Sequence, residues 1–456
     1  MMPSAPLTVD VRARRRGSFR SASLAAASLA VLFLGWQTPS ALGDGGFFSW
    51  LFGSRDADKP AVRVADKPAV RAPESDSGAT HEFKKAVTIK TSDGHGVQTF
   101  CLDGRGRIVA LAAPPRYYNG TPKNTHAEVH VLTSDGEPVT HWNVDFHGHS
   151  INVGPEGNIY VAGDGILAKF GPDGKLLKKL ELPHIAELLK NTKDIRKQAE
   201  AQLRNMTRAY DQMLSQYRER IKKLEAKPAA ELTTHDKFNL EQNRRMLERL
   251  QRQVDEQTGD MKVDNVVKSI TGRLRIINAV AVSDKDVFIV CGETTGYGYA
   301  VWRMDRDFQN AKQVMSGLRG CCGQMDIQVQ GADLLVAENC QHAFARYDRD
   351  GKKLGQWGKV TRGDDVKCFG GCCNPMNVRC GPNGDVLTAE SEGLIKRFSS
   401  KGDFVALVAK RPLSGGCKNV AVAASADGKL IYFCDQPGSQ IIILEQKAKS
   451  VAQATP

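Results

Sequence analysis

A pattern of tight turns and strand-like runs recurs six times along this chain, and it constrains the fold more than any other sequence feature. In each copy a turn rich in glycine, aspartate or asparagine precedes a run of apolar and β-branched residues. Outside one long insertion, the copies are spaced by about 40–50 residues. The runs are Ile108–Leu111, Asn158–Ala162, Val287–Val290, Leu334–Ala337, Val386–Ala389 and Leu430–Phe433. Asp-Gly and related pairs supply the positive φ that tight hairpins need, so each copy predicts a small antiparallel sheet.

Six small sheets cannot each bury both faces alone. They must pack against one another around an axis and close into a ring. We therefore predict a mainly β fold, a six-bladed β-propeller. The strand-like segment Val87–Lys90 has no inner strand before it. We expect it to complete the last blade, whose other strands come from the C-terminus, because this pairing removes exposed sheet edges.

The fifth copy carries the clearest family signature. An Asn-Pro pair and a strand lie in Cys373–Val378, and a glycine turn follows in Gly381–Val386. A basic-aromatic strand, Leu394–Phe398, then leads to a second turn at Lys401–Phe404. These residues resemble the NHL-repeat family of six-bladed propellers. The resemblance implies the fold, but the family includes scaffolds, ligand binders and a few enzymes, so it does not select a function.

The N-terminus has the pattern of an export signal. Five arginines precede an apolar run that ends in small residues, and the run of about 15 residues is short for a membrane span of roughly 20. We predict a signal peptide over 1–43 and a periplasmic or extracellular location, with an uncleaved membrane anchor as the alternative. A charged, proline-containing repeat at 57–63 and 65–71 predicts a disordered linker over 44–81.

A different periodicity interrupts the repeat over 185–270. Apolar residues recur at three- and four-residue steps along Ile195–Leu224 and Leu240–Met261, and the other faces are charged or amide-bearing. Thr233 and Asp236 have the spacing of a helix capping box. We predict a coiled-coil-like antiparallel helical hairpin about 50 Å long, inserted after the second blade. Its stripes are expected to pack on each other, and self-association through the hairpin is the alternative.

These patterns assign the first two blades to 82–184, the other four to 271–446 and a disordered tail to 447–456. The formal net charge of +12 is modest for 456 residues, and part of it lies in the export signal. We therefore expect no nucleic-acid partner. The expected partner is a protein or a small-molecule ligand. Any contact with a membrane would be through an N-terminal anchor of this chain.

The eleven cysteines are unevenly placed. In three consecutive blades, one or two of them follow a glycine just before the innermost strand. Because inner strands line the axial channel, we expect these cysteines to lie at one mouth of it. The candidates for a ligand- or partner-binding face are Cys321, Cys322, Cys372, Cys373 and Cys417.

Two histidines, His147 and His149, occupy the corresponding place before the second blade. Alternate residues of a strand share a face, so both could point into the channel. They could equally be hydrogen-bonded polar residues that join neighbouring blades. His147, His149, Cys322 and Cys373 are the candidate ligands if a transition metal binds, because imidazole and thiolate suit zinc, copper or iron.

Three functions remain open. The first is a binding module that uses the channel mouth as its ligand or partner face, and cysteines of exported proteins usually form structural disulfides. A metal-dependent lyase or hydrolase is the second alternative, since NHL-type amidating lyases use histidines around zinc, and gluconolactonase-like relatives hold a metal with acidic and amide side chains. A thiol-redox protein is the third.

The acidic ends of two equivalent strands are interpreted as structural. Glu338 and Glu390 occupy these positions, and the resemblance to the NHL-repeat family implies that they bind backbone groups or basic neighbours, of which Arg346 and Arg397 are the candidates.

Overall fold

The computed structural model describes residues 78–115, 125–258, 262–293, 298–321, 324–361, 365–371, 373–413 and 418–448. The predicted signal peptide, the predicted linker up to residue 77 and the predicted tail beyond residue 448 lie outside these residues. Within the described part, no helix is both long and apolar enough to span a bilayer.

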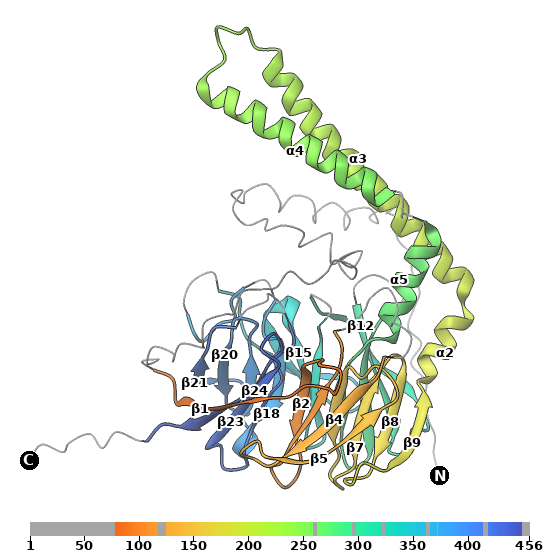
Figure 1. Ribbon diagram of the computed structural model, residues 1–456, viewed down its shortest axis with the longest axis vertical. Coiled ribbons are helices and arrows are strands. Elements are labelled where there is room, and N and C mark those ends of the chain that lie inside the picture. The colour runs from red at the N-terminus through yellow and green to blue at the C-terminus, as the bar shows by residue number, and fades with distance from the viewer. Residues whose placement is uncertain are drawn as a thin grey trace, which may run out of the picture. The chain divides into compact units, whose positions relative to one another are not determined.

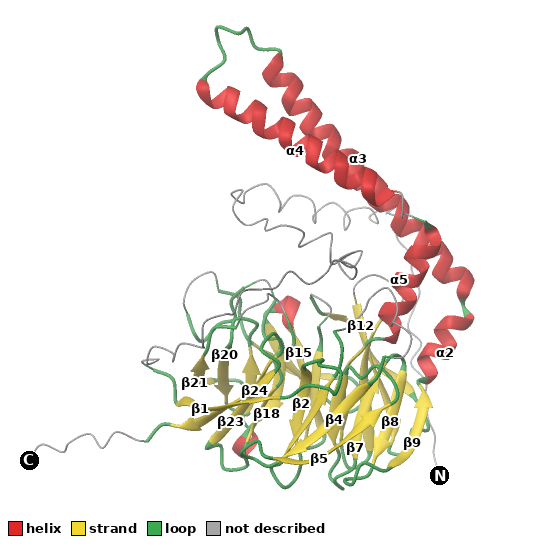
Figure 2. Cartoon of the chain, in the orientation of Figure 1, coloured by secondary structure: helices red, strands yellow, loops and turns green. Residues whose placement is uncertain are grey.

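The described strands form six four-stranded antiparallel sheets, and each sheet is one blade of a propeller (Figures 1 and 2). The first two blades consist of β2 (Val97–Leu102), β3 (Ile108–Ala112), β4 (Ala127–Leu132), β5 (Pro138–Val144), β6 (Ser150–Val153), β7 (Ile159–Gly163), β8 (Ile166–Phe170) and β9 (Leu176–Glu181). The next two consist of β10 (Ile277–Val282), β11 (Asp286–Gly292), β12 (Gly298–Asp305), β13 (Lys312–Arg319), β14 (Asp326–Gln330), β15 (Asp333–Glu338), β16 (Ala343–Tyr347) and β17 (Lys353–Trp357). The last two consist of β18 (Asn377–Cys380), β19 (Val386–Ala389), β20 (Leu394–Phe398), β21 (Phe404–Lys410), β22 (Val422–Ala424), β23 (Leu430–Asp435), β24 (Gln440–Gln446) and β1 (His81–Thr88). This confirms the predicted six-bladed β-propeller.

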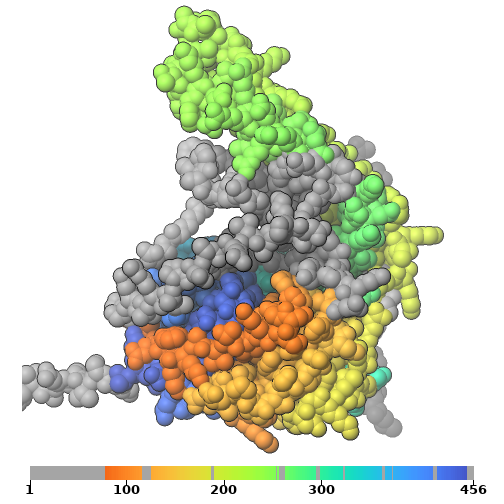
Figure 3. Space-filling view, viewed as in Figure 1, coloured from red at the N-terminus to blue at the C-terminus, as the bar shows by residue number. Residues whose placement is uncertain are grey.

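The ring closes where the two ends of the described chain meet. β1 pairs antiparallel with β24, with Val87 opposite Ile441, and so completes the sheet of β22–β24. Figure 1 shows β1 in orange beside the blue strands β23 and β24, and their surfaces adjoin in Figure 3. The expected closing strand is confirmed, although it begins at His81 rather than near Val87.

Apolar side chains from facing sheets fill the spaces between blades. Phe100 and Ile108 of the first blade pack in one cluster with Tyr432 and Ile443 of the last, and all four are buried. Successive side chains of a strand point to opposite faces of the sheet, so alternate residues supply each such cluster. Burial between sheets, rather than within any one sheet, therefore holds the blades together.

A hydrogen-bond network also joins the inner strands across the axis. From β18, Arg379 donates to the Gln328 side chain of β14, to Val422 O of β22 (3.2 Å) and to Phe100 O of β2 (3.4 Å). One guanidinium thus contacts the inner strands of three other blades.

The remaining two inner strands join through an amide. Asn152 of β6 donates from Nδ2 to Val280 O of β10 at 2.9 Å and to Gln328 Oε1 at 3.5 Å. Gln328 accepts from both Arg379 and Asn152, so the network includes one residue from each of the six inner strands.

Four helices lie between β9 and β10: α2 (Pro183–Lys190), α3 (Thr192–Glu225), α4 (Thr234–Thr258) and α5 (Val263–Arg275). The predicted hairpin is α3 with α4, and the capping box is confirmed. Asp236 N donates to Thr233 Oγ1 at 3.0 Å, and Thr233 N donates to Asp236 Oδ2 at 3.2 Å.

The helical insertion is longer than the sequence pattern indicated, because α5 continues to Arg275. Val266, Ile270 and Leu274 of α5 pack in one apolar cluster with Ile195 of α3 and Ile289 of β11. The insertion therefore shares the core of the third blade.

A buried histidine lies at this junction. His184 of α2 is only 1% exposed, and its ring stacks on Trp302 of β12 with centroids 5.5 Å apart. Burial lowers the pKa of His184 to about 4, against an ordinary value of 6.5, although a backbone hydrogen bond with Leu274 opposes the shift.

Acidification should therefore weaken the protein. Below pH 6.5 the unfolded chain takes up a proton at residue 184 that the folded chain refuses until about pH 4, so stability falls across this window. The loss should approach about 3 kcal/mol. Urea unfolding at several pH values should show this slope, and His184→Leu should reduce it. His235→Leu, at an exposed position on α4, is the control. Equal slopes for the parent and His184→Leu would contradict the assignment.

Candidate functional site

The two ends of the ring differ in the length of their connections. Because the strands of each blade alternate in direction, the turns between first and second strands and between third and fourth strands lie at one end. These turns contain from two residues, at 331–332, to six, at 306–311. The opposite end carries the longest segments, 113–126, 182–276 and 358–376. We call these the short-turn end and the loop end; Figure 2 shows the short turns along the lower edge of the sheets.

The candidates among the described residues, Cys321, Cys373, His147 and His149, belong to connections of the loop end. Cys321 is partly exposed in the segment before β14, and its backbone NH donates to Asn339 Oδ1 at 2.8 Å. Asn339 is fully buried and donates to Gln324 O (3.2 Å) and Met376 Sδ (3.9 Å). This amide therefore holds the segment before β14 next to the segment before β18, which contains Cys373.

Cys373 differs from the expectation of an exposed face, because only 1% of it is accessible. The neighbouring Asn374 fixes the segment: Ser391 N donates to its Oδ1 at 2.9 Å, and its Nδ2 donates to Gly370 O at 2.9 Å. Asn374 Nδ2 also donates to Glu392 Oε2 at 2.7 Å. The other candidates, Cys322, Cys372 and Cys417, lie outside the described residues, so their place on the face stays a prediction.

No disulfide joins two of the described cysteines. Cys101, Cys291, Cys380 and Cys434 are free thiols, and burial raises the pKa of all four. For Cys101 and Cys291 the pKa rises to about 12. The thiolate is the reactive form of cysteine, so these thiols pack as small apolar groups rather than as redox centres.

His147 and His149 are both buried and lie in contact. Ile277 N donates to His149 Nδ1 at 3.3 Å, and the nitrogens His149 Nε2 and His147 Nδ1 are 3.4 Å apart. His147 Nε2 lies 2.8 Å from Pro114 O. These contacts assign a proton to Nε2 of each ring, because each Nδ1 accepts and the last partner is a carbonyl.

In this chain of contacts, the unprotonated nitrogen of each imidazole, Nδ1, accepts a hydrogen bond. The chain of contacts runs from β10 through the segment before β6 to Pro114 in the connection after β3, so it spans three consecutive blades. The arrangement favours the alternative in which His147 and His149 join blades over the one in which they bind a metal.

The axis itself offers little space. A cavity of about 20 Å³ lies among the inner strands and is lined by residues that include Ser150, Asn278, Asp326 and Asn377. One water molecule needs roughly 10–15 Å³, so this cavity has the size of a water and not of an organic ligand. Burial raises the pKa of Asp326, while the nearby Arg379 guanidinium opposes the shift.

The expected partners of the two acidic strand ends are wrong. Glu338 accepts from Tyr347 Oη at 2.6 Å and pairs with Lys353 at 2.8 Å, and Glu390 pairs with Lys396. Strand register is the reason, because Arg346 lies opposite Leu335 and Arg397 opposite Leu387, several residues from each carboxylate.

Lys396 is a functional candidate that the sequence reading missed. It is 1% exposed, its Nζ donates to Cys368 O at 2.5 Å, and it lies 5.1 Å from the centre of the Phe369 ring. Gly370 N donates to Glu390 Oε2 at 3.3 Å. The buried Lys396–Glu390 pair therefore anchors the cysteine-bearing segment. The sequence did contain a signal for Lys396, the adjacent basic pair Lys396-Arg397. Neighbouring residues of a strand face opposite sides, so the two basic side chains cannot both point the same way.

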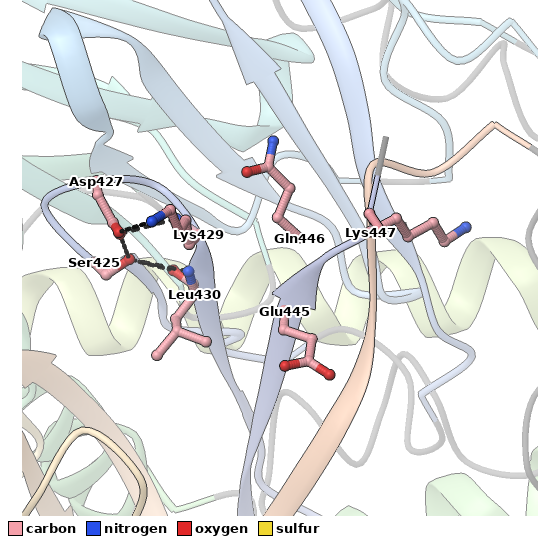
Figure 4. Close-up of a pocket in the computed structure, with 8 residues that line it drawn as sticks. Ser425, Asp427, Lys429, Leu430, Glu445, Gln446 and Lys447 are labelled. Carbon is pink, nitrogen blue, oxygen red and sulfur yellow. Dashed lines mark hydrogen bonds and ion pairs between the residues drawn. The ribbon is translucent and has the colours of Figure 1, made fainter. Parts of the chain in front are cut away.

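A larger pocket lies elsewhere among the described residues. It measures about 550 Å³ and lies at the short-turn end, between the β22–β23 turn and the end of β24. Figure 4 shows contacts among four of its lining residues: Ser425 Oγ donates to Asp427 at 2.7 Å and accepts from Leu430 N at 2.9 Å, and Lys429 pairs with Asp427. No sequence motif maps to it.

Comparison with known proteins extends only to the fold. No family profile matches the chain, and no curated protein matches it significantly. Among solved structures, a putative gluconolactonase covers 80% of this chain and 92% of its own at 11% identity, with a TM-score of 0.40. Regucalcin from Agrobacterium tumefaciens, a calcium-binding protein, covers 80% and 96% at 11% identity and 0.43. The Pan2 WD40 domain of Neurospora crassa covers 81% and 98% at 8% identity and 0.39.

The anchoring role of Lys396 can be tested by substitution. Lys396→Met should destabilise the protein by about 3–5 kcal/mol, because it leaves the Glu390 carboxylate buried without a partner. It should also speed the labelling of Cys368 by a thiol reagent. Urea unfolding and mass spectrometry of the labelled peptide measure the two effects.

The double variant Lys396→Met/Glu390→Leu should recover part of the lost stability, because it removes both buried charges. Lys401→Met, at an exposed turn position, is the control and should stay within about 0.5 kcal/mol of the parent. Unchanged stability and unchanged labelling in Lys396→Met would remove the anchoring role.

Proposed function

We propose that the protein is an exported propeller of NHL type that binds a protein partner through its loop end. The observation that carries the proposal is the difference between the two ends of the ring. The longest connections, including the helical insertion and the segment 358–376 with Cys368 and Cys373, belong to the loop end, and so does the shorter segment with Cys321. Binding residues concentrate on connections that a rigid scaffold positions, so the varied end is the better candidate for recognition.

The size of the axial cavity selects the kind of partner. Small-molecule sites typically occupy a few hundred Å³ or more, and the space on the axis is about 20 Å³. The small size of this cavity among the described residues favours recognition through the surface of the loops, which suits a protein. Val360 is 60% exposed and Val366 is 38% exposed in the connection between β17 and β18. Exposed apolar side chains of this kind contribute to protein interfaces.

Cys321 keeps its proposed place on this face, whereas Cys373 is buried. Cys321 is partly exposed there, and the Asn339 amide holds it against the next blade. In the proposal the asparagines and the Lys396–Glu390 pair fix the shape of the segments, and exposed groups of the same segments contact the partner. A fixed binding surface loses less conformational entropy on association.

Site-specific photo-crosslinking in the native host tests the proposal. A photoreactive residue at Gln341 or Val360, both exposed at the loop end, should give adducts of discrete mass. The matched positions Lys352 and Lys401, exposed at the short-turn end, should give none of those adducts. Adducts from the short-turn positions alone, or equal adducts from both ends, would contradict the proposal.

A further inference from the structure

Two imidazoles and a carboxylate form a second group at the loop end, in the connections before β2 and before β4. Asp93 and His95 belong to the connection between β1 and β2, and His126 immediately precedes β4. Two imidazole nitrogens lie near the same carboxylate oxygen. His95 Nε2 is 3.5 Å from Asp93 Oδ2, and His126 Nε2 is 3.9 Å from it.

The connection that carries Asp93 and His95 is held in a defined turn. Thr91 N donates to His95 O at 2.7 Å, and His95 N donates to Thr91 Oγ1 at 2.8 Å. The Thr91 hydroxyl in turn donates to Asp93 Oδ1. This contact occupies one carboxylate oxygen and leaves Oδ2 for the two imidazoles. Hydrogen bonds of this kind orient the ligands of metal sites.

A further contact fixes this turn against the strand that follows His126. Ser92 donates to Glu128 Oε1 of β4 from its backbone NH at 2.8 Å and from its hydroxyl at 2.6 Å. His126, Glu128 and His130 alternate along the chain, so they share one face of the strand. The Ser92–Glu128 contacts therefore hold the turn beside His126.

We propose that Asp93, His95 and His126 bind a divalent transition-metal ion of the Zn²⁺ class. Two imidazoles and one carboxylate form the ligand set of open zinc sites, in which water takes the fourth position. The three side chains are 45%, 39% and 37% exposed, respectively, so an ion reaches them from solvent. The site belongs to connections of the loop end, and its ligand set shares no residue with the His147–His149 pair.

Two of the distances within this ligand set can be compared with those of a zinc site. Zinc bonds of about 2.1 Å in a tetrahedral arrangement place ligand atoms about 3.4 Å apart. The Asp93–His95 pair has this spacing, and the His126 nitrogen must approach by about half an ångström. No three His, Cys, Asp or Glu side chains of the described residues already stand grouped as ligands of a metal. Binding therefore includes rotation of half-exposed side chains, which costs little.

Metal titration of the full-length protein tests the site. Calorimetry with Zn²⁺, and visible spectroscopy with Co²⁺, should each show one equivalent bound to metal-free protein. Asp93→Asn and His126→Ala should each weaken Zn²⁺ binding about tenfold or more. His235→Ala, which removes an exposed histidine from α4, is the control and should bind as the parent does.

Two results would overturn the proposal. One is the absence of stoichiometric binding, or equal binding by the parent and both substituted proteins. The other is a cobalt–thiolate charge-transfer band, which would assign the metal to cysteines. Because His126→Ala removes a packed side chain, His126→Gln and a melting curve accompany it. A folded His126→Gln protein that binds Zn²⁺ as tightly as the parent would also reject the site.

Discussion

The guanidinium of Arg379 lies where the inner strands of the ring meet, and the arrangement of the loop end depends on that meeting. It contacts three other blades directly, and Gln328 and Asn152 extend the network to the remaining two. Hydrogen bonds that involve a charged group contribute about 1.5–3 kcal/mol each, and a buried one that loses its partner costs more. Apolar packing holds each blade to its neighbours, whereas this network couples all six at once.

The side chains of the inner strands occupy the axial channel, and this determines where the propeller can bind a partner. The cavity that the described residues leave among the inner strands has the size of one water molecule. We therefore expect a partner to bind the connections between strands. Buried polar groups fix those connections. Asn339 and Asn374 hold the segments before β14 and β18, and the Lys396–Glu390 pair anchors the segment before β18. The same principle operates at the first blade, where Glu128 accepts two hydrogen bonds from Ser92.

The fold could be predicted from sequence because its signals are local. Asp-Gly turns and short apolar runs each specify a hairpin within a few residues, and the helical stripe and the Thr233–Asp236 box specify the hairpin insertion. The prediction ended the helical insertion at residue 270, whereas α5 continues further. Its apolar residues pack on the third blade, so this boundary depends on tertiary contacts.

The site could be predicted only in part, since its contacts depend on register and ring geometry. The repeat pattern placed Glu338 and Glu390 at strand ends. The register of the neighbouring strands, however, decides which basic side chain pairs with each carboxylate. The sequence left two orientations open for His147 and His149, and only the positions of Pro114 and Ile277 distinguish them. Nothing local in β18 indicates that Arg379 reaches three other blades.

Hydrogen exchange measured on Arg379→Met most directly tests whether the axial network couples the ring. The account predicts faster amide exchange in the inner strands of all six blades, β2, β6, β10, β14, β18 and β22, while Arg105→Met, at an exposed turn, leaves exchange unchanged. Faster exchange confined to β18, or none at all, would show that each blade is held by its neighbours alone and would contradict the account.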